Sequence, residues 1–140
     1  MAVPGKLATG WATSLAKGVK TNLYLMFNGV QVAVINAANG LTFVATAVTG
    51  AAGASTANAQ KVIITTESLT TAAGATYTET LTNSFITANS VCVVEVATAG
   101  TGTPVVTKVT PAAGSVVIII QNIHASAAFN AALTISVLAF

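Results

Sequence analysis

The sequence predicts an all-β fold. From residue 21 onward, short runs rich in Val, Ile, Thr and Phe alternate with segments rich in Gly, Asn and Ala, which is the pattern of strands joined by turns. Several runs place an apolar residue at every second position, as half-buried strands do. We therefore expect an antiparallel β-sandwich or a jelly-roll-like domain over residues 21–140, preceded by an N-terminal arm over residues 1–20.

The first strands are predicted from a hairpin signal. Residues 22–27 and 30–35 are two β-prone runs separated by Asn28-Gly29, and Asn-Gly between apolar runs favours a two-residue hairpin turn. A second turn follows, and residues 41–48 then alternate as one further strand. The small and polar residues at 49–59 are typical of a loop.

The later strands are predicted from alternation and from apolar runs. Residues 76–82 place four threonines on one face and larger side chains on the other. Residues 115–123 are the most apolar run and predict a central strand, whereas residues 89–97 predict a strand buried on both faces in its middle. Further strands are expected at 61–69, 103–109 and 130–138, which gives eight or nine in all.

A short motif, X-Ala-Ala-Gly-small, occurs three times. Its copies are residues 50–54, 71–75 and 111–115. The second and third copies have a strand candidate on each side, so a hairpin loop with Gly in the left-handed conformation explains them. The spacings between the copies are unequal, so the motif does not predict a solenoid.

Charge is scarce in this chain. Charged residues make up 6% of its 140 residues, hydrophobic residues make up 54%, and neither Arg nor Asp occurs, whereas ordinary soluble domains carry roughly 25% charged residues. A membrane-spanning helix needs about 20 consecutive apolar residues, but the strongest apolar run, 116–120, ends at Gln121. Disorder goes with low hydrophobicity, which the Val and Ile content contradicts. The composition therefore favours a subunit of a permanent assembly, whose obligate interfaces let it dispense with surface charge.

Residues that carry chemistry are few, and the sequence predicts no catalytic residue, no metal site and no cofactor. With no Asp, a catalytic triad would need a Ser, His124 and one of three Glu, and no nucleophile-elbow motif is present. We expect His124 to end a strand and to hydrogen-bond locally, with a metal site on a symmetry axis as the alternative. Cys92 lies in an apolar run and is expected to be a small core residue. The chain is therefore not expected to be an enzyme.

Two further segments are assigned by what they lack. Residues 100–103 are Gly-rich, but no Gly-Lys-Ser/Thr follows as in a phosphate-binding loop, so we expect a hairpin loop. The first residues lack the apolar core of a secretory signal, so we expect the protein to be made and assembled in a cytoplasm.

Residues 1–20 form the predicted arm and hold the predicted interface. They carry Lys6, Lys17 and Lys20 without an acid, together with the only tryptophan, Trp11. Because Trp is enriched where binding energy concentrates, we expect these four side chains to dock on a neighbouring subunit or partner, with Trp11 buried there. The alternative is that the arm folds back as an edge strand of its own sandwich. Three lysines without Arg or interleaved aromatics are too thin a basic footprint for nucleic acid.

Residues 69–78, 102–111 and 116–130 are three β-prone segments of the C-terminal half. Together they resemble small virion proteins of tailed bacteriophages, and above all capsid decoration, or cement, proteins. The resemblance implies a β-rich domain on the outside of a phage head that ties neighbouring major capsid proteins together and stabilises the shell. No functional residue is carried over, because the matching segments contain no functional motif.

The resemblance also implies partners and a location. The partners would be the major capsid protein and further copies of this chain, as a homotrimer, with no nucleic acid and no membrane. The location would be the virion capsid, after assembly in the host cytoplasm. The alternative is a phage tail or fibre module with a receptor-binding face.

Overall fold

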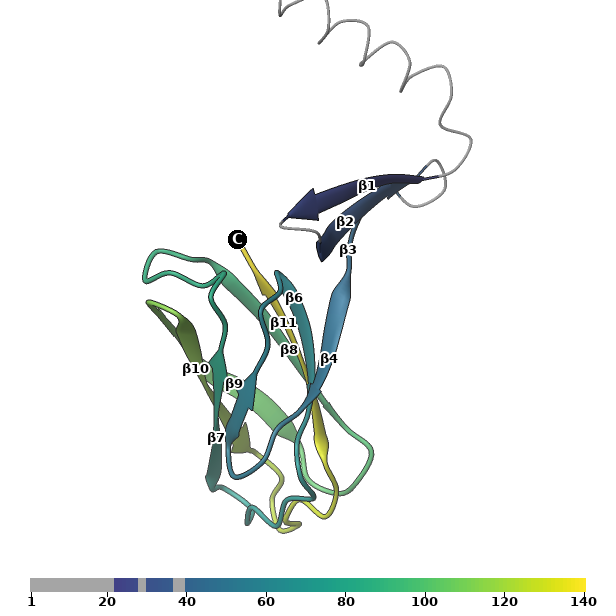
Figure 1. The fold of residues 1–140 in the computed structure, drawn as a ribbon. Helices are drawn as coiled ribbons and strands as arrows, with labels where there is room; N and C mark the ends of the chain where they lie inside the picture. The colour runs from purple at the N-terminus through teal and green to yellow at the C-terminus, as the bar shows by residue number, and fades with distance from the viewer. Residues whose placement is uncertain (1–21, 28–29, 37–39) are drawn as a thin grey trace, which may run out of the picture. The chain divides into compact units, whose positions relative to one another are not determined.

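The computed structural model describes residues 22–27, 30–36 and 40–140 and divides the chain into two units (Figure 1). The N-terminal unit is Met1–Val44 and the C-terminal unit is Ala45–Phe140. Every regular element of the described residues is a β-strand, and there are eleven of them. The predicted all-β fold is therefore confirmed for this part of the chain.

The N-terminal unit contains a three-stranded antiparallel sheet in the order β1-β2-β3. Its strands are β1 (Asn22–Phe27), β2 (Val30–Asn36) and β3 (Gly40–Phe43). β1 and β2 pair as the hairpin that the Asn-Gly signal predicts, although the register shifts between Leu25 and Met26. The predicted arm, with Lys6, Trp11, Lys17 and Lys20, lies outside the described residues and stays a prediction.

The boundary of the sandwich differs from the expected one. The predicted strand 41–48 is two strands, because β3 ends at Phe43 and β4 (Ala45–Thr49) pairs in a different sheet. The alternation of apolar residues continues across Val44, so it carries no signal that the pairing partner changes there. The sandwich therefore begins at Ala45 rather than at residue 21.

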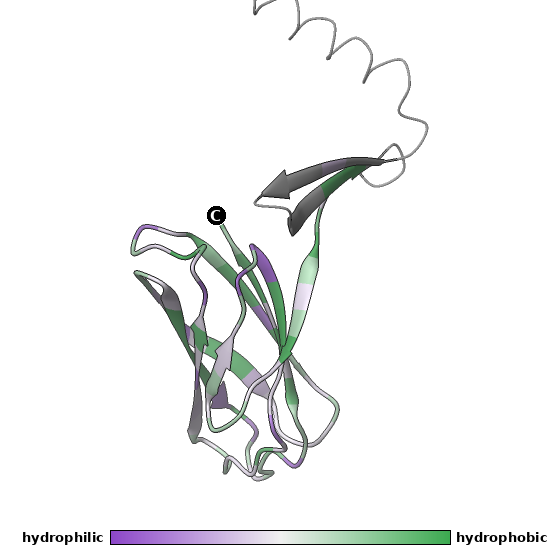
Figure 2. Ribbon diagram, in the orientation of Figure 1, coloured by the Kyte–Doolittle hydropathy of each residue, from purple (hydrophilic) through white to green (hydrophobic). Residues whose placement is uncertain are grey.

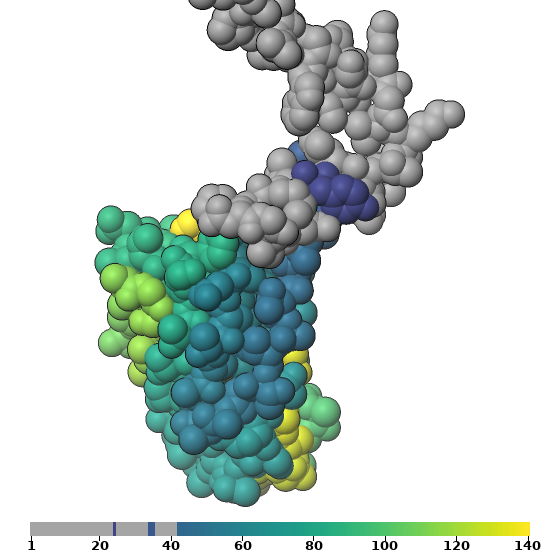
Figure 3. Space-filling model, viewed as in Figure 1, coloured from purple at the N-terminus to yellow at the C-terminus, as the bar shows by residue number. Residues whose placement is uncertain are grey.

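The C-terminal unit is a sandwich of two four-stranded sheets (Figure 1). One sheet has the order β4-β6-β11-β8, with β6 (Lys61–Thr65), β11 (Leu133–Ala139) and β8 (Cys92–Thr98). The other has the order β5-β7-β10-β9, with β5 (Ala54–Thr56), β7 (Thr76–Thr82), β10 (Ser115–Asn122) and β9 (Pro104–Ala112). Figure 3 shows from the same side that atoms of the segment from β4 to β6, in blue, cover much of the viewed side of this unit.

The strands of the sandwich are mostly antiparallel, but each sheet has one parallel pair at its edge. β4 pairs with β6 and β5 pairs with β7 in parallel, which departs from the expected antiparallel pattern. A parallel pair needs a crossover connection. The crossover from β4 to β6 contains β5, which belongs to the opposite sheet. In the same way, the crossover from β5 to β7 contains β6, which belongs to the sheet opposite those two strands.

Most connections pass from one sheet to the other. β9 and β10 are the one consecutive pair within the described sandwich that stays in the same sheet, as the hairpin over Ala113-Gly114. The loops at 71–75 and 100–103 join the two sheets, so the expectation that they are hairpin loops is wrong. The glycines of the three motif copies do adopt the predicted left-handed conformation, with φ of 74° at Gly53, 77° at Gly74 and 80° at Gly114.

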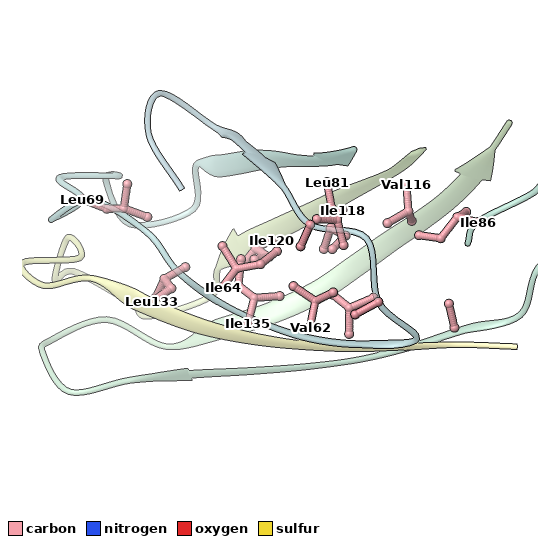
Figure 4. Packing of buried hydrophobic residues seen from close by; sticks show 14 of the residues in the cluster. Val62, Ile64, Leu69, Leu81, Ile86, Val116, Ile118, Ile120, Leu133 and Ile135 are labelled. Carbon is pink, nitrogen blue, oxygen red and sulfur yellow. The ribbon is translucent and has the colours of Figure 1, made fainter. Parts of the chain in front are cut away.

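The core lies between β10 and β11, which are interior strands of the two sheets. Val116, Ile118 and Ile120 alternate toward the interior along β10, and Leu133 and Ile135 do so along β11; all five are 0% exposed (Figure 4). Figure 2 shows the apolar colour along several strands of the sandwich. The predicted central position of β10 is confirmed. β8, by contrast, is an edge strand that alternates between exposed and half-buried residues, so its predicted burial on both faces is wrong.

Candidate interaction surface

His124 has the local role that the sequence predicts. It follows the end of β10, and its Nδ1 accepts hydrogen bonds from the backbone N–H groups of Ser126 at 3.1 Å and Ala127 at 2.8 Å. Both bonds fold the loop that leaves β10. This imidazole is therefore part of a turn.

A buried asparagine that the sequence reasoning missed holds one end of the sandwich together. Asn122 is 0% exposed, and its Oδ1 accepts from the backbone N–H of Thr103 at 3.0 Å and of His124 at 3.2 Å. Its Nδ2 donates to the backbone carbonyls of Thr71 at 3.2 Å and Ala127 at 2.9 Å. One side chain thus connects three loops that are far apart in sequence.

A tyrosine–carboxyl pair lies inside the β5-β7-β10-β9 sheet. The Tyr77 hydroxyl donates to Glu79 Oε2 at 2.7 Å, and Glu79 is 0% exposed. Within the described residues, Glu79 Oε1 has no hydrogen-bond partner. Gly50 gives this oxygen its room, since a Cβ there would lie 3.2 Å from Oε1. Burial, followed by the hydrogen bond to Glu79 and the nearby negative charges, raises the pKa of Tyr77 above its ordinary range, so the phenol stays a donor.

Cys92 is half-buried and packs against the core, as predicted. Burial raises the pKa of its thiol, which keeps the sulfur protonated and makes it a weak nucleophile. Among the described residues, no group of three or more His, Cys, Asp or Glu side chains is placed to hold a metal ion. The same residues include no helix with the length and apolar character needed to span a bilayer.

The outer face of the β5-β7-β10-β9 sheet is rich in threonine. β7 contributes Thr76, Thr78, Thr80 and Thr82, whose intervening neighbours point into the core. The register places Thr78 beside Ile119 of β10. The outward side chains of β10 are half-buried, so hydroxyl groups dominate what this face presents to water.

The outer face of the β4-β6-β11-β8 sheet presents large apolar side chains. Val91 is 64% exposed, Val93 is 57% exposed and Phe140 is 60% exposed. Val91 and Phe140 exchange two backbone hydrogen bonds, of 3.1 and 3.0 Å, and Val93 is the register partner of Leu138. We call these four side chains, together with Ile63 of β6, the apolar face.

Two opposite charges border the apolar face. The register aligns Lys61 of β6 with Leu138, and Glu95 of β8 with Ser136, so both charges flank β11 on its outer side. A shallow depression of about 240 Å³ lies between them, lined by Lys61, Val93, Glu95, Ser136, Val137 and Leu138. The depression therefore has an apolar and hydroxyl floor with a cation on one side and an anion on the other.

The apolar face is the strongest candidate functional site of the described residues. Contiguous apolar patches on the surface of a protein mark sites that bind other proteins. The sequence held a signal for it, since Val91 and Val93 share one face of an alternating strand while Cys92 and Val94 share the other. Residues 91–94 by themselves predict burial on both faces, because a continuous apolar run does not tell which face meets solvent. Glu95, two residues after Val93 on the same face, is the signal that this face is exposed.

Comparison with known proteins adds no function to this geometry. No family model, no curated protein and no solved structure matches the chain.

Proposed function

We propose that this protein is a virion structural protein that decorates the outer surface of a bacteriophage head and stabilises the shell of the major capsid protein. The observation that carries this proposal is the apolar face, with Val91, Val93 and Phe140 all more than half exposed. Such a patch on a chain with 6% charged residues would promote uncontrolled association unless another protein chain covers it.

Four side chains capable of acid–base or polar chemistry, Asn122, His124, Tyr77 and Glu79, have structural partners, which supports a non-enzymatic role. Asn122 and His124 fold and connect loops. Tyr77 and Glu79 face each other inside the sheet. An enzyme needs acid and base groups that reach a substrate, and these groups reach one another or the backbone.

The mechanism of stabilisation is mass action. A protein that binds the assembled shell but not its separated subunits stabilises the shell by RT ln(1 + [L]/Kd), where [L] is the free concentration of the decoration protein. Assembly in the host cytoplasm, contact with the major capsid protein and a homotrimeric state belong to this proposal. So does docking of the N-terminal arm through Lys6, Trp11, Lys17 and Lys20.

The proposal is tested by copy number and by attachment. Gel densitometry of purified particles should show on the order of hundreds of copies per particle, as symmetric coverage of a shell requires. A few dozen copies or fewer would contradict decoration and favour a tail or fibre module.

Attachment is tested with a matched pair of variants. Val93→Glu, on the apolar face, should lower the amount of protein retained on particles, because it places an unpaired charge in a buried contact. Thr78→Glu adds the same charge on the threonine-rich outer face and should be retained as the wild type is. Equal retention of the two variants would show that attachment does not depend on a protein chain covering the apolar face.

A further inference from the structure

We infer that the apolar face binds the same face of a second copy of this chain, with Lys61 of each copy paired with Glu95 of the other. This inference rests on the proposed function only in assuming that a protein chain covers the face. It goes further by naming the occupant and the residues that select it.

The distribution of charge is the first argument. Residues 45–140 contain five charged side chains, and two of them, Lys61 and Glu95, stand on this one face. Of the other three, Glu79 is buried, Glu67 is half-buried in the loop after β6, and Lys108 is paired in register with Ile119 on the outer side of the opposite sheet. The sandwich therefore places one charge of each sign beside the apolar face.

The geometry is the second argument. β6 and β8 are separated by β11, so Lys61 and Glu95 are about 10 Å apart across the strands and about 7 Å apart along them. Within the described residues, no ion pair joins these two side chains to each other. Consider a two-fold axis that lies in the plane of the face, crosses β11 between Ser136 and Leu138, and is perpendicular to the line from Lys61 to Glu95. Rotation about this axis places each lysine opposite the other copy's glutamate.

The pattern favours a second copy over an unrelated partner. The face carries no net charge, and one cation and one anion on opposite sides of an apolar centre are complementary to the same pattern turned by 180°. A two-fold contact uses the same patch on both subunits, so each such pair of charges forms twice. Leu138 then lies between the two ion pairs with Val93 and Ile63 beside it, and Val91 and Phe140 extend the contact beyond the row of Lys61 and Leu138.

The size of the face sets the expected strength. Four strands spaced about 5 Å apart and about 20 Å long give about 400 Å² per copy. A total of about 800 Å² is below the roughly 1,200 Å² at which stable interfaces begin, so we expect a weak contact that strengthens with concentration. Because a two-fold contact pairs copies two by two, it adds to any trimer contact made elsewhere in the chain and does not form the trimer.

Charge exchange tests the pairing directly on the full chain. In Lys61→Glu the two copies would oppose glutamates, and in Glu95→Lys they would oppose lysines. We expect each variant alone to raise the dissociation constant of the pair about tenfold or more in sedimentation velocity over a concentration series. In an equimolar mixture of the two variants, a dimer made of one copy of each variant again has a Lys–Glu pair at both contacts. The dissociation constant of this mixed dimer should therefore be within about threefold of the wild-type value.

The control is a change of charge on the sheet that does not carry the apolar face. Lys108→Glu makes the same change of charge on the opposite sheet and should leave pairing unchanged. All of these substitutions are at the surface, and melting curves show whether each variant is folded. If the wild type does not pair, or if the mixture of folded variants pairs no better than either variant alone, the inference is wrong.

A zero-length carbodiimide cross-link provides a second readout, which identifies the residues in contact. In a mixture of ¹⁴N- and ¹⁵N-labelled protein, the inference predicts a Lys61–Glu95 cross-linked peptide of mixed isotope composition, and its absence contradicts the inference. Neither experiment uses particles. Low copy number on particles would therefore overturn the proposed function while leaving the pairing intact, and failure to pair would overturn only this inference.

Discussion

The two sheets of the sandwich have the same number of strands and similar interiors but opposite outer surfaces. The β5-β7-β10-β9 sheet presents a column of threonines on β7, and it buries the Tyr77–Glu79 pair on its inner side. The β4-β6-β11-β8 sheet presents Val91, Val93 and Phe140, and its inner positions on β6 and β11 are apolar. The first sheet thus has polar groups on both sides, and the second has apolar groups on both sides.

This difference supports the proposal that one outer surface meets water and the other meets protein. A sheet that is apolar on both faces is typical of strands covered on both sides. The β4-β6-β11-β8 sheet approaches this pattern at the end that carries Val91, Val93 and Phe140, which are exposed there, although Lys61, Glu95 and Ser136 add polar groups to the same outer face. The threonine-rich sheet has the composition of an ordinary half-exposed sheet, with the exception of one buried carboxyl.

The largest effects are expected where the two sheets are alike. Ile118→Ala on β10 and Ile135→Ala on β11 should each lower the free energy of unfolding by about 3 kcal/mol, because both remove fully buried methyl groups. Denaturant unfolding measures both. Ile119→Ala, on the half-buried outer side of β10, is the control and should cost clearly less. A large difference between Ile118→Ala and Ile135→Ala would show that the two interiors are not equivalent.

The Tyr77–Glu79 pair should make the threonine-rich sheet the more sensitive one to loss of a single hydroxyl. Tyr77→Phe removes the hydrogen-bond donor to a fully buried carboxyl and should cost about 1–3 kcal/mol of unfolding free energy. In a Glu79→Gln background the same substitution should cost less, because a neutral amide is less expensive to leave unsatisfied than a carboxylate. A double-mutant cycle with no coupling between the two positions would contradict the pairing.

The same tyrosine predicts how stability depends on alkaline pH. Burial is the largest cause that raises the pKa of Tyr77 in the fold, whereas an unfolded tyrosine ionises near about pH 10. The contribution of Tyr77 is therefore complete below pH 10, and it is lost as pH rises further, because the unfolded state then releases a proton that the folded state keeps. Urea unfolding from about pH 9 to 11.5 should show a decline that is shallower in Tyr77→Phe.

Strands with strong local patterns could be predicted from the sequence, and their partners could not. β7 has the predicted bounds, Thr76–Thr82, because its alternation of threonine with larger residues is regular. β5 was missed because its three residues, Ala54–Thr56, are small and lie in a segment typical of a loop. The parallel edge pairs depend on which distant strand lies alongside, and a single sequence does not encode this in any local pattern.

The functional surface was also only partly accessible from the sequence. The inward positions of β10 recur at every second residue through Ile120, and the same period reaches Asn122, so alternation alone would have placed this amide in the interior.

The apolar face needed the pairing of Val91 with Phe140, which are far apart in sequence. Its charges, Lys61 and Glu95, come together only through the register of β6, β11 and β8.

A gain in stability, smaller than the losses described above, is expected from a substitution in the turn between β4 and β5. Ala52 has φ of 52° and Gly53 has φ of 74°, and Ala51 and Ala54 exchange hydrogen bonds of 3.0 and 3.1 Å, as in a type I′ turn. Alanine is strained at a positive φ, and asparagine tolerates it. Ala52→Asn should therefore raise the free energy of unfolding by about 0.5–1 kcal/mol.

The hairpin of the third motif copy supplies the matched control for this turn. Ala113 also precedes a left-handed glycine, but among the described residues Ala52 is the one non-glycine residue with a positive φ. Ala113→Asn should accordingly bring no gain in thermal or denaturant unfolding. An equal gain at both turns would mean that the conformation of Ala52 is not the cause.

The smallest effect on folding, and the sharpest test of the two outer surfaces, comes from exchanging a methyl group and a hydroxyl between them. Val93→Thr makes the apolar face more polar, and Thr78→Val makes the threonine-rich outer face more apolar. Both positions are exposed on strands and both residue types favour strands, so each change should alter the free energy of unfolding by about 0.5 kcal/mol or less.

Association should respond differently to the two changes. Val93→Thr should weaken pairing in sedimentation and retention on particles, because it puts a hydroxyl into an apolar contact. Thr78→Val should leave both unchanged, since its face is expected to meet water. If the two variants behave alike in both measurements, the contrast between the outer surfaces has no part in assembly.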